Sequence, residues 1–206
     1  MKTNIKKINV DWTEIKNQCR HTSNKEDTET PATKKFIKQI LISEHSPIRL
    51  GKIKWSWDGI KYWVSVHFSR HWLGWEKWVS TQRTDRTGVN RDASSQDAPV
   101  NMDIEANIQS LINVSRFRLC RQASDETREY MEDLKMAIRD AGEKEISDVM
   151  VPQCIYKAGC SEFVCCGHIG EFIKWAKENG KEINWTNIQQ RYDLYNEYFY
   201  SKKEHN

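Results

Sequence analysis

Apolar residues recur at helical spacing in five stretches of the chain. In the first stretch, the apolar residues between Phe36 and Leu41 stand at i, i+1, i+4 and i+5, the pattern of one helix face. This periodicity predicts helices over residues 33–44, 103–122, 124–141, 172–179 and 186–201. Ser124 is a typical N-cap for the third helix, and Thr186 with Gln189 fits a capping box for the last.

Other stretches lack a clear helical period. Residues 48–57 alternate in part between apolar and polar, which predicts a strand, and the turn signal Asp58-Gly59 follows it. Residues 60–71 fit a strand and a helix equally well, so periodicity leaves both open. The first 32 residues predict a short ordered start followed by a loop, and residues 80–101 predict a long polar loop.

Composition limits the class of protein. The chain has 206 residues, of which 38% are hydrophobic and 30% charged, enough for one domain with its own core and a small appendage at most. The net charge of +3 gives no chain-wide attraction for polyanions, so a basic site must be local. No run of about 18 apolar residues occurs, and we expect no membrane-spanning helix. Residues 1–12 lack the apolar segment of a signal peptide, so we expect a cytoplasmic protein.

Four of the six cysteines crowd into one short segment. Cys154, Cys160, Cys165 and Cys166 lie close to His168, whereas Cys19 and Cys120 stand alone. Without a secretory signal, reduced thiols are the favoured interpretation. Thiols and an imidazole could hold zinc, but the spacing is not that of a paired Cys-x2-Cys knuckle, and we expect a metal-free segment.

The densest chemical feature is the stretch 69–86. Six of the nine tryptophans fall between Trp55 and Trp78, and the stretch interleaves tryptophans with the cations Arg70, His71, Lys77, Arg83 and Arg86. Aromatic faces beside cations suit a planar, anionic ligand such as a flavin nucleotide, a pyrimidine nucleotide or a single nucleic-acid strand. The alternative is an amphipathic segment whose tryptophans fill the core.

The order of these residues resembles the signature of the flavin-dependent thymidylate synthases. That signature begins Arg-His-Arg and closes Ser-x-Arg after seven variable residues. Arg70 and His71 match its start, and Ser80 stands at the spacing of its serine. The sequence departs from the signature at Trp72, Lys77, Trp78 and Gln82.

Two further regions are similar to the same family. Asn113 precedes Arg118 by five residues, as in the family's later segment, and the helix start from Ala123 to Arg128 follows. Upstream, the order of Cys19-Arg20-His21-Thr22, a helix and Glu44-His45-Ser46-Pro47 is similar to the family's N-terminal order. The resemblance covers roughly residues 17–138. The segment between Ser80 and Arg118 is shorter than is typical, so the chain resembles a shortened, phage-type member.

The resemblance implies an α/β fold in which a small antiparallel-rich sheet is packed by helices, with residues 60–71 helical. It divides the chain into a synthase-like domain, 1–142, and a Cys-rich helical extension, 143–206. It also implies FAD as cofactor, held between the subunits of a homotetramer. The expected reaction is methylation of dUMP to dTMP with methylenetetrahydrofolate as carbon donor and NADPH as reductant, and no protein nucleophile is required.

The resemblance assigns roles residue by residue. Arg70, His71 and Asn113 would contact FAD, while Ser80 and Arg118 would act at the dUMP site. The remaining expected substrate-binding residues are Arg83, Gln122 and His67. The departures from the signature keep a second interpretation open: a catalytically divergent protein that binds a nucleotide or a single nucleic-acid strand. A small zinc protein built on the C-terminal cysteines is the third.

Overall fold

The computed structural model describes residues 2–204 and contains one four-stranded sheet. Its strands are β1 (Thr3–Asn9), β2 (Lys52–Lys61), β3 (Trp75–Val79) and β4 (Pro99–Asn107). The helices are α1 (Trp12–His21), α2 (Lys34–Ser43), α3 (Tyr62–Ser69), α4 (Thr84–Thr87), α5 (Ile108–Arg118), α6 (Asp125–Asp140), α7 (Lys144–Val149), α8 (Gln153–Tyr156), α9 (His168–Glu178) and α10 (Ile188–Glu204), with 3-10 turns η1 (Ser46–Leu50) and η2 (Arg91–Ala93).

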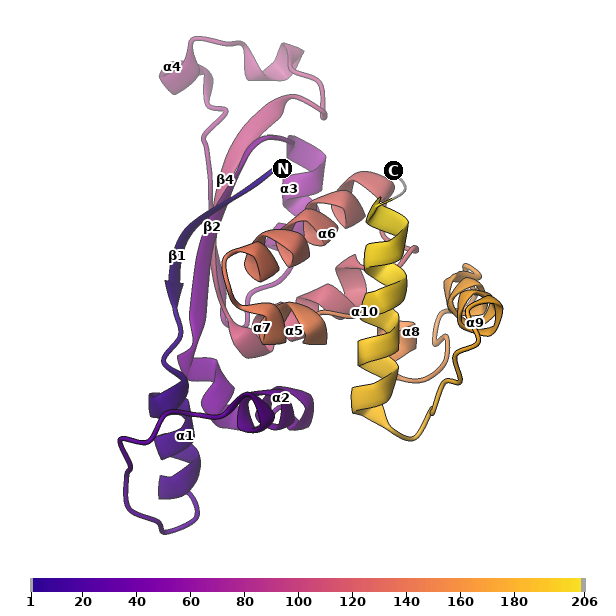
Figure 1. Ribbon diagram of the computed structural model, residues 1–206. Helices are drawn as coiled ribbons and strands as arrows, with labels where there is room; N and C mark the ends of the chain where they lie inside the picture. The colour runs from indigo at the N-terminus through magenta and orange to yellow at the C-terminus, as the bar shows by residue number, and fades with distance from the viewer. Residues whose placement is uncertain (1, 205–206) are drawn as a thin grey trace.

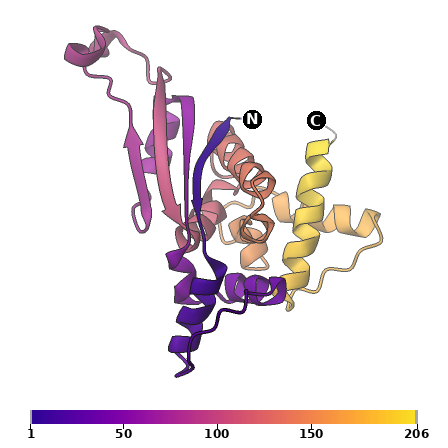
Figure 2. The same cartoon turned by 60° about the vertical axis from the view of Figure 1, so that its left-hand side comes forward.

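The strands run in the order β1-β2-β4-β3, and every neighbouring pair is antiparallel. Helices α3, α5 and α6 lie on one side of the sheet, and α10 lies beyond α6, farther from the strands (Figures 1 and 2). The opposite side of the sheet carries no helix in either view. The predicted α/β class with an antiparallel sheet packed by helices is therefore confirmed.

The first five residues of the predicted helix 103–122 belong to strand β4. The expected helix 103–122 begins only at Ile108, where the Asn107 side chain caps it by accepting from the Ser110 N–H at 2.8 Å. Before that point, Met102, Ile104 and Ala106 are buried while the residues between them are not. This period of two is that of a strand with one covered face, so the helix prediction was wrong over 103–107.

Strand β2 also differs from the expectation. It begins at Lys52, after the 3-10 turn η1, and continues through the predicted turn at Asp58-Gly59. The register with β4 shifts between Trp57 and Ile60, and Gly59 has φ +68°, so the turn signal marks a bulge inside the strand. Residues 62–69 then form α3, which confirms the expected helix over these residues, whereas the expectation was wrong at Ile60 and Lys61, which belong to β2.

The other helices match their predicted positions, with shifted ends. Ser124 caps α6 as expected, accepting from the Thr127 N–H at 3.4 Å. Helix α9 begins four residues earlier than predicted, at His168. The predicted capping box of α10 was wrong, because Asn187 accepts from the Gln190 N–H at 3.1 Å in place of Thr186. The ordered start of the chain is longer than expected and comprises β1 and α1.

Tryptophans occupy the centre of the core. Trp55, Trp57 and Trp75 are fully buried, and the ring of Trp55 meets those of Trp57 and Trp75 edge to face at 5.8 and 5.3 Å. Edge-to-face contact suits aromatic quadrupoles. These three tryptophans therefore fill the core, whereas Trp72 and Trp78 remain 69% and 53% exposed.

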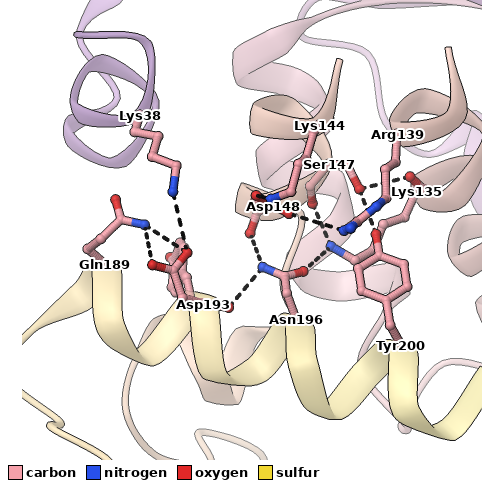
Figure 3. A network of polar contacts seen from close by, with 11 residues as sticks. Lys38, Lys135, Arg139, Lys144, Ser147, Asp148, Gln189, Asp193, Asn196 and Tyr200 are labelled. Atoms are coloured by element: carbon pink, nitrogen blue, oxygen red, sulfur yellow. Dashed lines mark hydrogen bonds and ion pairs between the residues drawn. The ribbon is translucent and has the colours of Figure 1, made fainter. Parts of the chain in front are cut away.

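The C-terminal helix α10 is joined to α6 and α7 by a buried polar network (Figure 3). Lys135 Nζ donates to the carbonyl of Ser147 at 2.5 Å and to Asn196 Oδ1 at 2.7 Å. Asn196 Nδ2 in turn donates to the carbonyl of Asp148 at 2.8 Å. The apolar core also continues from the sheet into α9 and α10, so the C-terminal extension shares one core with the rest of the chain. None of the helices within residues 2–204 has the length and apolar character needed to cross a membrane.

Candidate functional site

The ends of α3 and α5 meet at a contact between His71 and Arg118. His71 follows Arg70, the C-terminal cap of α3, and Arg118 is the last residue of α5. Arg118 Nε donates to His71 Nε2 at 2.9 Å, and Arg118 Nη2 donates to the carbonyl of His67 at 2.7 Å. A carbonyl in the last turn of a helix lacks an intrahelical partner, and a guanidinium satisfies it well. The meeting of the ends of α3 and α5 thus positions the side chains of His71 and Arg118.

The hydrogen bond defines the protonation of His71. A guanidinium has only donors, so His71 Nε2 must accept, and the neutral ring carries its proton on Nδ1. Burial, with the positive charges of Arg118 and Lys77, lowers the pKa of His71 to about 4. Among the residues that the structure describes, Nδ1 of His71 has no hydrogen-bond partner. It is therefore a neutral donor available to a ligand at neutral pH.

Arg118 is a half-buried cation without a carboxylate. Two arginines near it in the sequence are paired: Arg116 with Glu44, and Arg121 with Glu171. Within residues 2–204, neither Arg118 nor Arg70 forms an ion pair. Burial and the nearby charge of Arg70 lower the pKa of Arg118. Two neighbouring guanidinium groups without counter-ions make a site for an anionic or electron-rich ligand.

Apolar side chains flank this pair. Trp72 and Leu73 follow His71 and are 69% and 71% exposed, and Phe117 precedes Arg118 and is 54% exposed. Lys77 Nζ donates to the carbonyl of His71 at 2.6 Å and holds the start of β3 against it. The sequence patterns did not single out Phe117. Its position outside the buried stripe of α5 is nevertheless a usable signal of an exposed apolar residue. Exposed apolar residues thus stand next to His71 and Arg118 in the sequence.

His67 lies beside the pair, on α3. Its Nδ1 is 2.9 Å from the hydroxyl of Thr127, and its ring meets Trp63 edge to face at 5.3 Å. Burial, followed by the charges of Arg118 and Arg70, lowers the pKa of His67. The structure therefore brings His67, Arg70, His71 and Arg118 together in one chain.

The other predicted site residues make their contacts outside this group. Ser80 is exposed after β3, paired with Asn101, and a strand rises about 3.4 Å per residue, which places it roughly 17 Å along from Trp75. Arg83 is exposed and bound to Asp85 at 2.7 Å. Asn113 accepts from Arg116 at 3.2 Å, and Gln122 donates to the carbonyl of Val164 at 2.7 Å.

No protein-family model matches the sequence, and the comparison with curated proteins finds no match. Solved structures do match. Flavin-dependent thymidylate synthase ThyX of Helicobacter pylori, complexed with FAD and dUMP, superposes with a TM-score of 0.59 at 12% identity, over 72% of this chain and 99% of that one. A second structure of the same enzyme gives the same score over 73% and 99%.

A third match is the UMP/dUMP methylase PolB of Streptomyces cacaoi, bound with 5-Br dUMP. It has a TM-score of 0.58 at 10% identity and covers 73% of this chain and 95% of that one. Nearly the whole of each relative is therefore matched, while more than a quarter of this chain lies outside the match. The chain has the fold of the flavin-dependent thymidylate synthases.

Proposed function

We propose that this protein methylates dUMP to dTMP in a flavin-dependent reaction, with methylenetetrahydrofolate as carbon donor and NADPH as reductant of FAD. The observation that carries the proposal is Arg118, a half-buried guanidinium without a carboxylate, bonded to a neutral His71. The fold supports it, since ThyX was crystallised with FAD and dUMP and PolB is a dUMP methylase.

The residues present fit a flavin and a nucleotide. Arg118 uses Nε and Nη2 in the chain, and among residues 2–204 its Nη1 has no partner. The free Nδ1–H of His71 suits an acceptor on a planar ring, and Trp72 supplies an exposed aromatic face. A reduced flavin bound here would supply the hydride of the reaction.

The chain's own groups bind and orient. Arg118 would hold the pyrimidine and stabilise negative charge on its carbonyl oxygen, since a guanidinium keeps its proton throughout. Arg70 and His71 would contact FAD, with His71 donating from Nδ1. Because the pKa of His71 is about 4, its ring stays neutral and acts as a fixed donor near pH 7.

Ser80, Arg83 and Asn113 would reach the site from another subunit. They are exposed, and within residues 2–204 none of them hydrogen-bonds to the His71–Arg118 pair. A site shared between subunits of a homotetramer would explain both their exposure and their lack of hydrogen bonds to the pair. The exposed Trp72, Leu73 and Phe117 would give the subunits an apolar contact surface. Gln122 and His67 complete the proposed substrate contacts.

The absorbance spectrum of the purified protein tests flavin binding. The proposal expects flavin bands in the protein as isolated, or bands that stay with the protein after FAD is added and excess removed. Arg49→Ala, an exposed arginine outside the site, is a matched control and should bind FAD as wild type does. A wild-type protein that retains no FAD would overturn the proposal.

A specific observation favours a second candidate, a protein that binds a single nucleic-acid strand on the same fold. Trp78 is exposed, and Lys54 Nζ lies 5.2 Å from its ring centroid. An aromatic ring beside a cation is the usual platform for an unstacked base. Affinity for a single-stranded oligonucleotide that falls steeply with salt, without FAD binding, would select this function.

A further inference from the structure

Five thiols line one small cavity between α5, α8 and the loop before α9. Cys120 follows α5 and Cys154 lies in α8, while Cys160, Cys165 and Cys166 lie in the loop; all five are free thiols, and of these Cys165 is exposed. The cavity has a volume of about 10 Å³, the size of one water molecule or one ion. Burial, reinforced by the charges of Cys120, Cys166 and Cys160, raises the pKa of Cys154 to about 12. Burial is also the main cause that raises the pKa of Cys120, with added effects from Cys166, Glu162 and Cys160.

The loop that carries Cys160, Cys165 and Cys166 has few hydrogen bonds to hold it. No backbone N–H or C=O of residues 160–166 forms a backbone hydrogen bond within the described chain. One side-chain bond, from Gln122 to the carbonyl of Val164, reaches it. Phe163 and Val164 are exposed, so the loop buries little apolar surface. A loop of this kind requires another cross-link to keep one conformation.

His168 closes the cavity from α9. It is 8% exposed, and both of its ring nitrogens are buried without a hydrogen-bond partner. Burial lowers the pKa of His168 to about 4, so the ring is neutral, with one donor and one acceptor. An unpartnered buried imidazole is costly, and it lines the same cavity as the thiols.

We propose that this cavity is a structural zinc site, with Cys120, Cys154, Cys160 and Cys166 as ligands and His168 donating a hydrogen bond to one ligand sulfur. Four thiolates in a tetrahedron are a preferred donor set for zinc. Binding releases the four thiol protons to solvent as the ion loses its water ligands. Arg121 also lines the cavity, with its guanidinium bound to Glu171. The spacing of the C-terminal cysteines alone predicted a metal-free segment. That prediction left out Cys120, which is remote in sequence but lines the same cavity.

Binding would close the loop onto the ion. As the side chains of residues 2–204 now stand, no three His, Cys, Asp or Glu are arranged to hold a metal ion. Zinc needs its sulfur ligands about 2.3 Å away. Residues 160–166 can make this movement without breaking a backbone hydrogen bond. Cys165 also lines the cavity, but its side chain is exposed, whereas the other four thiols are buried or half-buried, so we place Cys165 outside the ligand set.

Elemental analysis of the full-length protein, expressed with added zinc and purified without chelators, tests the site. We expect about one zinc per chain, and cobalt in its place should give the absorbance of a tetrahedral thiolate centre. Cys160→Ser and Cys166→Ser should lose the metal and become more sensitive to proteolysis in the loop. Cys165→Ser and Cys19→Ser are matched controls that should keep it.

Four results would overturn the proposal. The first is a wild-type protein that binds neither zinc nor cobalt under reducing conditions, and the second is a Cys160→Ser, Cys166→Ser double variant that retains zinc. The third is a disulfide among these cysteines in protein purified without air. The fourth is iron with sulfide bound in place of zinc. Circular dichroism of each variant separates loss of metal from loss of fold, because both loop cysteines lie outside helices and strands.

Discussion

Arg118 Nε donates to Nε2 of His71 at 2.9 Å, which joins the last residue of α5 to the residue after the cap of α3. The bond fixes the tautomer of His71 and leaves its Nδ1–H free. It also holds a guanidinium, itself without a carboxylate, at the same place. One contact between residues 47 positions apart therefore creates both a neutral donor and an unpaired cation.

Replacing Arg118 with Ala should weaken dUMP binding about 10- to 150-fold, since a charge-assisted hydrogen bond contributes roughly 1.5–3 kcal/mol. FAD binding should change little. His71→Ala should do the reverse, because His71 is the proposed flavin contact. Paired calorimetric titrations of both variants with both ligands check this. Unchanged dUMP affinity in Arg118→Ala would remove Arg118 from the substrate site.

The pKa of His71 offers a test that needs no ligand. NMR titration should give about 4 for His71 and for His168 in the wild type. In Arg118→Ala the pKa of His71 should rise toward 6.5, whereas that of His168 should stay low, because burial and then the charge of Arg121 lower it. Burial is the main cause of the His71 shift, so the rise should be partial. An ordinary pKa for His71 in the wild type would contradict the site geometry.

These two histidines also affect stability at acid pH. A depressed pKa means that the unfolded chain takes up a proton near pH 6.5, whereas the folded chain does so only near pH 4. Their contribution is complete above pH 6.5 and is lost as pH falls toward 4. Urea unfolding of His168→Gln, compared with wild type between pH 7 and 4, should therefore show a shallower fall in stability. Parallel curves would show that His168 is not buried in its neutral form.

Lys135 should make stability rise with pH. Burial lowers its pKa from 10.5 to about 7, so between these values the unfolded chain holds a proton that the folded chain has released. Raising the pH through this window favours the folded state, by an amount on the order of 1 kcal/mol per pH unit. Lys135→Met should flatten the dependence in urea unfolding at pH 7, 8 and 9. The exposed Lys157→Met is the control and should keep it; equal slopes in all three proteins would contradict the assignment.

Gly74 and Gly88 separate backbone strain from crowding. Both have positive φ, +65° and +72°, but a Cβ on Gly74 would lie 2.1 Å from Asn107 Nδ2, whereas one on Gly88 meets nothing within 4 Å. Each change to Ala should cost about 1–2 kcal/mol for the left-handed backbone. Gly74→Ala should cost about 1 kcal/mol more, because it displaces the cap of α5. Equal unfolding free energies for the two variants would argue against this close packing.

The sequence predicted the parts of the fold that depend on local pattern. Helices α2, α6 and α10 follow from apolar periodicity, and Ser124 from capping chemistry. Strand β4 was missed because its period of two runs directly into the helical period of α5, and a window that spans both favours the longer pattern. The sequence predicted a turn at Gly59, where the structure has a bulge. Turns and bulges both favour a positive φ, and periodicity cannot distinguish them.

The candidate site was predictable in part. The motif resemblance identified Arg70, His71 and Arg118, but only the tertiary fold shows that Arg118 donates to His71. Which tryptophans face solvent was not predictable, since Trp72, Trp75 and Trp78 share one spacing but only Trp75 is fully buried, on the inner face of β3. The contribution of Cys120 to the thiol cavity depends on the meeting of α5 and α8, which no local pattern encodes.

Mass spectrometry of the nucleotide product tests the central claim most directly. The protein, loaded with FAD, is mixed with dUMP, methylenetetrahydrofolate and NADPH. We predict dTMP, heavier than dUMP by one CH2 unit, formed only when all components are present, retained in Arg49→Ala and strongly reduced in Arg118→Ala. A preparation that binds FAD and dUMP yet forms no dTMP would contradict the claim.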